Sequence, residues 1–251
     1  MINPSILDHP LLTERYFYPR SESFKNPFWV DCGDAQLSCY YHNKYPESKT
    51  IILFHGNGEI ISDYFDMFIP IFDQMKFNIF FAEYRGYAMS SGVPGLSIIQ
   101  SDVEKIVNAI GLPPEKLILF GRSLGSLYAV HGVYLFPTIS GLIIESGIAV
   151  LLERVLMRIH PQELGITLDE LMATVNREFN LREKLEKYKG TTLVLHAKED
   201  TMVHSAHAMK LFNWAPEPKF IKLFDEGDHN DIITTNFQEY FQLIYEFVSR
   251  K

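Results

Sequence analysis

The stretch FGRSLGS, residues 120–126, joins the apolar run KLILF (116–120) to a second apolar stretch over 124–136. The first run predicts a buried strand and the second a helix, so Ser123 stands between two glycines at a strand-to-helix turn. Such a turn can hold a serine in a strained conformation with its Oγ exposed, because small neighbours let the backbone cross itself closely. An ordinary glycine-rich turn without chemistry is the alternative.

Apolar runs rich in Ile, Val and Phe alternate along the chain with longer helical patterns. The predicted strands are 28–32, 37–43, 50–55, 77–84, 116–120, 141–146, 191–197 and 219–225. The predicted helices are 59–76, 97–111, 124–136, 202–214 and 234–250. Gly33-Asp34 predicts a hairpin between the first two strands, and the later, continuously apolar runs are typical of parallel strands covered on both faces. The sequence therefore predicts an α/β fold with a mostly parallel, eight-stranded sheet.

Residues 147–190 break this alternation. They contain the helical patterns IAVLLERVLMRI and LDELMATVNREF and no strand pattern. A segment of this size is short for a second domain, so we expect a helical insertion within one domain that spans residues 1–251.

Composition excludes several classes of function. The 251 residues carry a formal net charge of -8, which argues against nucleic acid or an anionic membrane as a partner. The two cysteines, Cys32 and Cys39, have neither disulfide-framework nor metal-site spacing and are expected to be free thiols. The sequence shows no signal-peptide pattern and no apolar run of membrane-spanning length, so a cytoplasmic protein is expected.

A nucleophilic serine requires a base and an acid that orients the base. In a sheet of this kind both follow the serine, in the order acid then histidine, each after a later strand. Asp200 follows the strand 191–197 and His229 follows the strand 219–225. The two therefore complete a predicted triad with Ser123. Taken alone, His229 could be a surface histidine, and the other candidates for the acid are Glu145, Glu199, Asp225 and Asp228.

The loop FHGNGE, after the third predicted strand, suits the second half of an oxyanion hole. Its glycines allow the backbone to turn inward. We predict that the backbone N–H groups of Asn57 and Leu124 stabilise the oxyanion. His55 is expected to brace the loop rather than bind a metal, because no other ligand has suitable spacing.

These motifs resemble the α/β-hydrolase superfamily over nearly the whole chain. The matching segments are HGNG, EYRGYAMSSG (83–92), GRSLGS, HAKED and GDHND. The R-G-Y segment is similar to one in the branch of serine esterases, acyl-protein thioesterases and Bem46-like hydrolases, from whose usual patterns this chain departs at Glu83 and Ala88 and in the missing glycine of HAKED.

The resemblance implies an acyl ester or thioester substrate, an acyl-enzyme intermediate and no cofactor or metal. It also implies that 147–190 forms a cap over Ser123. The leucines of this segment, with nearby aromatics, could line an apolar acyl pocket, but leucines at helical spacing more often pack against the sheet. The candidate pocket residues are Gly56, Gly58, Glu59, Tyr87 and Arg122, and for Arg122 a structural role is favoured.

Three other functions remain open at this point. A serine peptidase or amidase could use the same triad, and a non-catalytic binding protein could use the same fold. GNGEII followed by Glu83 also imitates part of a dinucleotide-binding fingerprint, but its third glycine position is Ile61.

Overall fold

One sheet organises the molecule, for which a computed structural model describes residues 5–250. In this part of the chain the eight strands run in the order β1-β2-β4-β3-β5-β6-β7-β8. They are β1 (Phe28–Asp31), β2 (Gln36–His42), β3 (Thr50–Phe54), β4 (Asn78–Ala82), β5 (Leu117–Arg122), β6 (Gly141–Glu145), β7 (Thr191–Ala197) and β8 (Lys219–Phe224). The β1–β2 and β2–β4 pairs are antiparallel and the remaining pairs are parallel. The predicted, mostly parallel sheet is confirmed.

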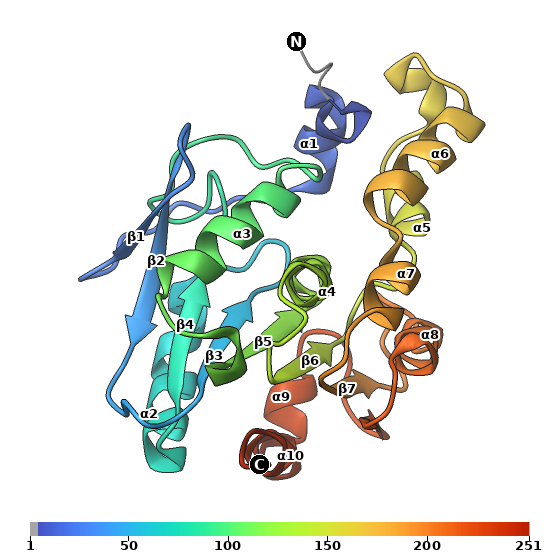
Figure 1. Ribbon diagram of the computed structural model, residues 1–251. Helices are drawn as coiled ribbons and strands as arrows, with labels where there is room; N and C mark the ends of the chain where they lie inside the picture. The colour runs from blue at the N-terminus through green and yellow to red at the C-terminus, as the bar shows by residue number, and fades with distance from the viewer. Residues whose placement is uncertain (1–4, 251) are drawn as a thin grey trace.

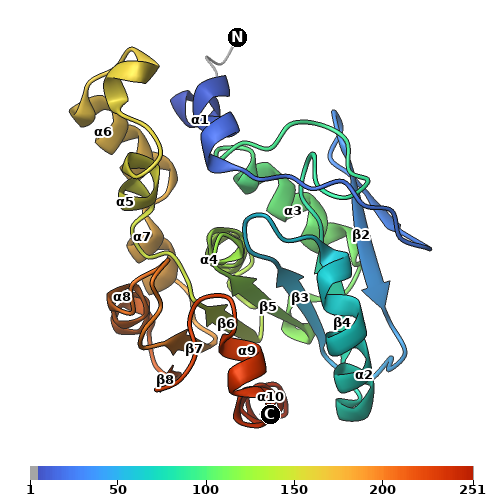
Figure 2. The ribbon, with the colours of Figure 1, turned by 180° about the vertical axis from the view of Figure 1, so that it is seen from behind.

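Helices cover both faces of this sheet, as Figures 1 and 2 show from opposite sides. The α-helices outside the insertion are α1 (Pro10–Tyr16), α2 (Phe65–Met75), α3 (Ile99–Ala109), α4 (Gly125–Leu135), α8 (Ala206–Trp214), α9 (Ile232–Thr235) and α10 (Phe237–Val248). Short 3-10 turns are η1 (Ile6–Asp8), η2 (Ile61–Tyr64) and η3 (Pro114–Lys116). The hydrophobic core consequently has two layers, with α3 and α4 in one and α2 and α10 in the other.

Central strands explain why the apolar runs are continuous rather than alternating. Every residue of β3, β4, β5 and β6 is buried, because helices exclude water from both faces. Each buried Leu, Ile or Phe contributes about 1.5–3 kcal/mol relative to an exposed position. The sheet is therefore a rigid base for the loops that follow its strands.

The segment 147–190 lies between β6 and β7 and is helical, as its sequence predicts. It contains α5 (Leu151–Leu156), η4 (Pro161–Leu164), α6 (Leu168–Glu178) and α7 (Leu181–Glu186). These helices form a column beside the sheet (Figures 1 and 2), and α6 contacts the short turn η1 that precedes α1. Ser5 Oγ donates to the Glu178 carboxylate at this contact.

Some helix boundaries differ from those predicted. The pattern over 234–250 is interrupted at Asn236, whose side-chain amide donates to the carbonyls of Glu226 and Ile232 at 2.9 and 3.0 Å. Asparagine favours such local bonds over continued helix. The helix predicted over 202–214 begins only at Ala206, and α1 has no counterpart among the predictions.

The two cysteines are free, and Cys39 is buried while Cys32 is partly exposed. Within residues 5–250, no helix is both long enough and apolar enough to span a bilayer.

Candidate active site

Ser123 occupies the sharp turn that its sequence context predicts, between β5 and α4. Its φ is +49°, a left-handed conformation that a residue with a Cβ rarely adopts. Its N–H donates to the Glu145 carbonyl at 2.9 Å and so ties the turn to the neighbouring strand. A Cβ on Gly121 would lie 2.5 Å from the Gly125 carbonyl oxygen, and one on Gly125 would overlap the Phe54 carbonyl. The close backbone crossing therefore requires both glycines.

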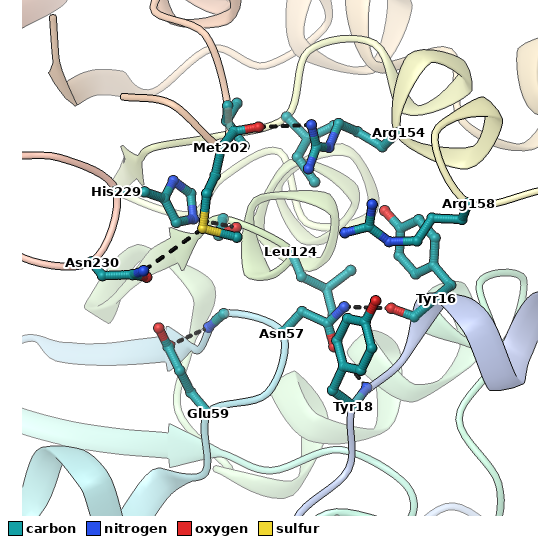
Figure 3. A pocket seen from close by; sticks show the side chains of 14 residues that line it. Tyr16, Tyr18, Asn57, Glu59, Leu124, Arg154, Arg158, Met202, His229 and Asn230 are labelled. Carbon is teal, nitrogen blue, oxygen red and sulfur yellow. Dashed lines mark hydrogen bonds between the residues drawn. The ribbon is translucent and has the colours of Figure 1, made fainter. Parts of the chain in front are cut away.

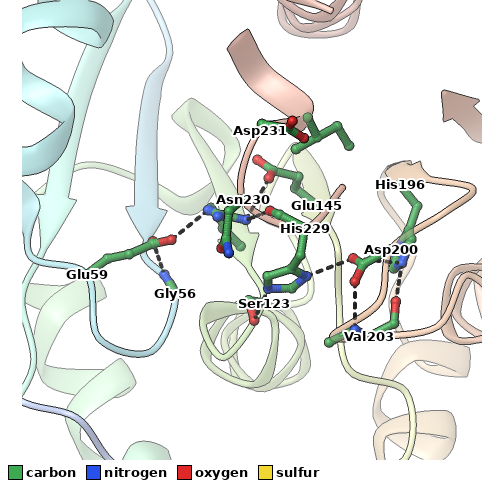
Figure 4. A network of polar contacts seen from close by, with 12 residues as sticks. Gly56, Glu59, Ser123, Glu145, His196, Asp200, Val203, His229, Asn230 and Asp231 are labelled. Atoms are coloured by element: carbon green, nitrogen blue, oxygen red, sulfur yellow. Dashed lines mark hydrogen bonds and ion pairs between the residues drawn. The ribbon is translucent and has the colours of Figure 1, made fainter. Parts of the chain in front are cut away.

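The side chains of Ser123, His229 and Asp200 form a continuous hydrogen-bonded relay (Figure 4). Ser123 Oγ lies 3.0 Å from His229 Nε2, and His229 Nδ1 lies 2.7 Å from Asp200 Oδ2. An ionised carboxylate can only accept, so Nδ1 carries the proton and Nε2 is free to accept from the serine hydroxyl. The structure thus brings together the three residues of the predicted triad.

Asp200 is held in its ionised form by several donors. Its Oδ1 accepts the backbone N–H groups of Met202 and Val203 at 2.9 and 2.7 Å. Burial alone would raise its pKa, but hydrogen bonds from His196 and His229 outweigh burial and hold the pKa of Asp200 well below its usual range. The carboxylate can therefore orient and stabilise a protonated His229 ring.

The other acidic residues near the relay have different contacts. Glu199 is exposed, and Asp225 pairs with Lys198 at the surface. Asp228 accepts from the backbone N–H of Thr201 at 2.9 Å and from that of His229 at 2.6 Å. Asp228 consequently links the loops after β7 and β8 without contacting the imidazole ring.

Glu145, the remaining candidate for the acid, faces away from the imidazole ring of His229. Its Oε1 lies 3.0 Å from Arg122 Nη1, and its Oε2 accepts from Tyr240 Oη at 2.6 Å. Of the acidic candidates considered, only Asp200 therefore contacts the imidazole.

Arg122 has the structural contacts that the sequence favoured. Its guanidinium pairs with Glu59 at 2.9 Å and with Glu145 at 3.0 Å, and it donates to the His229 carbonyl at 3.0 Å. Glu59 in turn accepts the Gly56 N–H at 2.6 Å. One buried cation thereby connects the histidine loop with the loop after β3.

The loop after β3 lies beside the elbow, as an oxyanion hole requires. Within residues 5–250, neither the Asn57 nor the Leu124 backbone N–H donates to another protein atom. The Asn57 side chain fixes the loop, because its Oδ1 accepts from the Tyr18 N–H at 3.1 Å and from the Tyr87 hydroxyl at 2.8 Å. Both predicted backbone donors therefore retain hydrogen-bonding capacity.

His55 is buried and braces this loop. Its Nδ1 donates to the Gly56 carbonyl at 2.7 Å, and its Nε2 lies 2.6 Å from Glu83 Oε1. The other oxygen of Glu83 accepts the Ile61 N–H at 3.1 Å. A carboxylate enclosed in this way cannot reach the ribose of a dinucleotide, so the partial fingerprint has a structural explanation.

A cavity of about 90 Å³ opens onto Ser123 and His229 (Figure 3). It is lined by Tyr16, Tyr18, Gly56, Asn57, Glu59, Ser123, Leu124, Ile148, Arg154, Arg158, Met202, Val203, His229 and Asn230. Among the candidate pocket residues, Gly56 and Glu59 line it. The other three candidates do not line the cavity. Gly58 is covered by Tyr18, and the side chains of Tyr87 and Arg122 are buried in the protein.

The lining also corrects the expected character of the pocket. The insertion contributes Ile148 and two cations, Arg154 and Arg158, and none of its leucines. Five of those leucines, Leu151, Leu164, Leu171, Leu181 and Leu185, are buried in the hydrophobic core instead. Sequence reasoning also missed Tyr16 and Tyr18, which reach the cavity through packing of the N-terminal segment. The i, i+4 spacing of the two arginines was the one local signal available.

The sequence also matches a known family that is consistent with this geometry. Residues 45–175 match the sequence profile of the Hydrolase_4 family, described as serine aminopeptidase, S33. The match covers more than half of the chain. The chain belongs to this family. The superfamily is that of the α/β-hydrolases, as the motifs predict.

Individual relatives agree with this membership. The mouse "Alpha/beta hydrolase domain-containing protein 17C" is 26% identical over 227 residues, which cover 87% of this chain and 65% of the relative. The human protein of the same name is also 26% identical, with 64% of its length covered. The chain thus spans a little under two thirds of the length of these relatives.

Solved structures share the fold at low sequence identity. The Pyrococcus furiosus esterase Pf2001 superposes with a TM-score of 0.73 at 17% identity, covering 92% of this chain and 97% of its own. The Paleococcus ferrophilus monoacylglycerol lipase superposes with a TM-score of 0.67 at 19% identity, covering 84% of this chain and 98% of its own.

Proposed function

We propose that this protein is a serine hydrolase that cleaves a carboxylic ester or thioester through an acyl-enzyme. The observation that carries the proposal is the relay from Ser123 Oγ through His229 to Asp200, with contacts of 3.0 and 2.7 Å, at the floor of a cavity. We also propose that residues 1–251 form one domain, with 147–190 as its cap.

The first half-reaction acylates the serine. Ser123 Oγ attacks the substrate carbonyl carbon while its proton passes to His229 Nε2. Asp200 fixes the ring and stabilises the imidazolium. When the tetrahedral intermediate collapses, the bond to the alcohol or thiol breaks and His229 returns the proton to that leaving group. Water then attacks the acyl-enzyme by the same route and releases the acid.

The negative charge of each tetrahedral intermediate develops on the former carbonyl oxygen. The backbone N–H groups of Asn57 and Leu124 are the proposed donors to it, which the absence of protein acceptors for both within residues 5–250 supports. Leu124 also precedes the first turn of α4, where the positive end of the helix dipole favours an anion.

Cleavage of an amide is the second candidate, because the matching family is described as a serine aminopeptidase. An aminopeptidase substrate presents a protonated amine, which needs an available carboxylate. Among residues 5–250, Glu59 is the one carboxylate that lines the cavity, and it already pairs with Arg122, while Arg154 and Arg158 add two positive charges. The electrostatics therefore favour an ester or thioester over an N-terminal peptide.

A three-substrate comparison tests the proposal. Purified protein is assayed with p-nitrophenyl butyrate, the butyryl thioester of N-acetylcysteamine and alanine p-nitroanilide. We expect turnover of one or both acyl substrates, its loss in Ser123→Ala, and full retention in Ser101→Ala, which replaces an exposed serine on α3. Equal turnover by the two variants would refute the serine mechanism, and preference for the anilide would favour the peptidase.

A further inference from the structure

Two arginines face the proposed nucleophile from the cap side of the cavity. Arg154 belongs to α5, and Arg158 follows just beyond its end, so a spacing of four residues brings both to one side. Figure 3 shows the Arg158 guanidinium beside Tyr16 and the Arg154 guanidinium directed toward the Met202 carbonyl, and both arginines line the pocket that Ser123 also lines.

Neither arginine forms an ion pair with a carboxylate of residues 5–250. This is unexpected in a chain with 31 acidic and 23 basic residues. The nearby carboxylates are occupied elsewhere, since Glu153 pairs with His207 and Lys210, and Glu163 pairs with Arg15. The cavity therefore has two positive charges without a neighbouring counter-charge of their own.

Arg158 is the less satisfied of the two. Its guanidinium forms no hydrogen bond to any described residue, and its buried Nε has no partner. The Arg158 guanidinium carbon lies 6.0 Å from the centre of the Tyr18 ring, a cation–π contact. Arg154 uses Nη1 to donate to the Met202 carbonyl at 2.7 Å. A buried donor without a partner is unfavourable, and an anionic ligand would supply the missing acceptors.

The Tyr16 hydroxyl group lies in the field of both cations. Burial raises the pKa of Tyr16 to about 12, and the positive charges of Arg154 and Arg158 act against that rise. A neutral phenol beside two guanidinium groups offers a further donor to an oxyanion. The side chains of Tyr16, Arg154 and Arg158 thus all offer donors, and the cavity volume of about 90 Å³ suits a compact group better than a long acyl chain.

We infer that Arg154 and Arg158 bind an anionic group, a carboxylate or a phosphate, carried by the ester or thioester that Ser123 attacks. Guanidinium groups match the planar, multidentate geometry of these oxyanions. The inference rests on the proposed function, and it assigns to the cap a specificity for esters or thioesters that carry an anionic group.

Matched ester pairs test this inference. On the leaving-group side, p-butyryloxybenzoate is compared with its methyl ester, and p-butyryloxyphenyl phosphate with p-butyryloxyanisole. On the acyl side, mono-p-nitrophenyl adipate is compared with its methyl ester. The measured quantity is the ratio of kcat/KM for the anionic ester to that for its neutral partner. The three pairs distinguish a carboxylate from a phosphate and one side of the scissile bond from the other.

We expect the wild-type ratio to exceed unity by roughly 10- to 100-fold in at least one pair, as for charge-assisted hydrogen bonds. Arg158→Gln should bring that ratio close to one, mainly through KM, and Arg158→Lys should give an intermediate value because it keeps the charge and loses the fork. Arg154→Gln should also lower it. Arg250→Gln is the matched control, since this arginine stacks on Phe220 outside the cavity and likewise forms no ion pair with a carboxylate of residues 5–250.

The outcomes separate this inference from the proposed function. A wild-type ratio near one in all pairs, or a ratio unchanged in both Arg158→Gln and Arg158→Lys, would overturn the arginine assignment while ester turnover upholds the serine mechanism. A protein that hydrolyses none of the esters and takes up no fluorophosphonate label would overturn both. Circular dichroism and urea unfolding identify any variant that has lost its fold.

Discussion

Arginine has opposite surroundings on the two sides of the proposed active site. Below the histidine loop, Arg122 is 5% exposed and contacts two carboxylates and a carbonyl. Across the cavity, the Arg158 guanidinium is without a hydrogen bond in the described part of the chain. A buried charge is tolerated when its partners surround it completely. We therefore interpret Arg122, whose hydrogen bonds and ion pairs are formed within the protein, as a positioning residue, and Arg158, which lacks them, as a binding residue.

The partners of Arg122 show what it positions. Glu59 accepts from Gly56 in the proposed oxyanion loop, and the His229 carbonyl belongs to the loop that carries the base. Burial by itself would lower the pKa of Arg122, but Glu145 and Glu59 outweigh burial and raise it. The guanidinium is thus charged at every working pH, and its contacts persist.

The largest effect of a substitution on activity is expected in the relay of Ser123, His229 and Asp200. Asp200→Asn should lower kcat roughly 10⁴-fold, because the amide no longer holds His229 in the tautomer that accepts from Ser123. The matched control is Glu199→Gln, which removes an exposed carboxylate one residue away. Steady-state kinetics on p-nitrophenyl butyrate measures both, and a comparable loss in the two variants would disprove the assignment of the acid.

Replacing each of the two arginines by methionine is expected to change the free energy of unfolding by different amounts. Arg122→Met leaves the buried Glu145 and the half-buried Glu59 without a cation and should reduce the free energy of unfolding by about 3–5 kcal/mol. Arg158→Met removes a charge that has no partner, so its effect should stay within about 0.5 kcal/mol. Urea unfolding at neutral pH measures both values. Similar destabilisation by both would contradict the distinction between the two arginines.

A smaller effect concerns pH. Burial would raise the pKa of Glu59, but Arg122 and the Tyr64 hydroxyl outweigh it, so the pKa lies below its usual value. A carboxylate with a lowered pKa stabilises the fold above its unfolded pKa of about 4.3, and this contribution is lost as the pH falls through the lower folded value. In Arg122→Met, the cation that offsets burial is missing, so burial raises the pKa of Glu59. The ionised Glu59 carboxylate then destabilises the fold at neutral pH.

The difference in unfolding free energy between wild type and Arg122→Met should consequently be largest near neutrality. It should begin to narrow while the pH is still above about 4.3, where Glu59 takes up a proton in the variant, and should narrow further below about 4.3, where Glu59 takes up a proton in the wild type. The corresponding difference for Arg158→Met should be nearly independent of pH. A gap for Arg122→Met that stays constant from pH 7 to pH 3 would show that Glu59 does not depend on this cation.

Local sequence was sufficient for the fold and for the proposed catalytic relay. Strand-ending motifs carry Ser123, Asp200 and His229, and the parallel sheet brings the carboxyl ends of its strands to one edge. Because each of these three residues follows a strand of the parallel sheet, their positions in the sequence predicted that their side chains would lie close together. Sequence also singled out Asn57 and Leu124, since they sit in loops whose glycines mark the close approaches.

The pocket lining could not be predicted in the same way. Tyr16 and Tyr18 reach the cavity because the N-terminal segment packs against the loop of Asn57, a contact between residues 39 positions apart. Arg154 and Arg158 lie in a helical insertion that packs against η1, α4 and α8 through α6 and α7, so its orientation depends on these distant segments as well as on its own pattern. An amphipathic pattern shows which side of a helix is apolar, but not which cavity its polar side faces.

The most direct test of the serine mechanism is fluorophosphonate labelling followed by peptide mapping. We expect a single covalent adduct on the peptide that contains Ser123, no adduct in Ser123→Ala, and a much slower reaction in His229→Gln. An adduct that persists in Ser123→Ala, or a wild-type protein that turns over esters without labelling at Ser123, would contradict the serine mechanism.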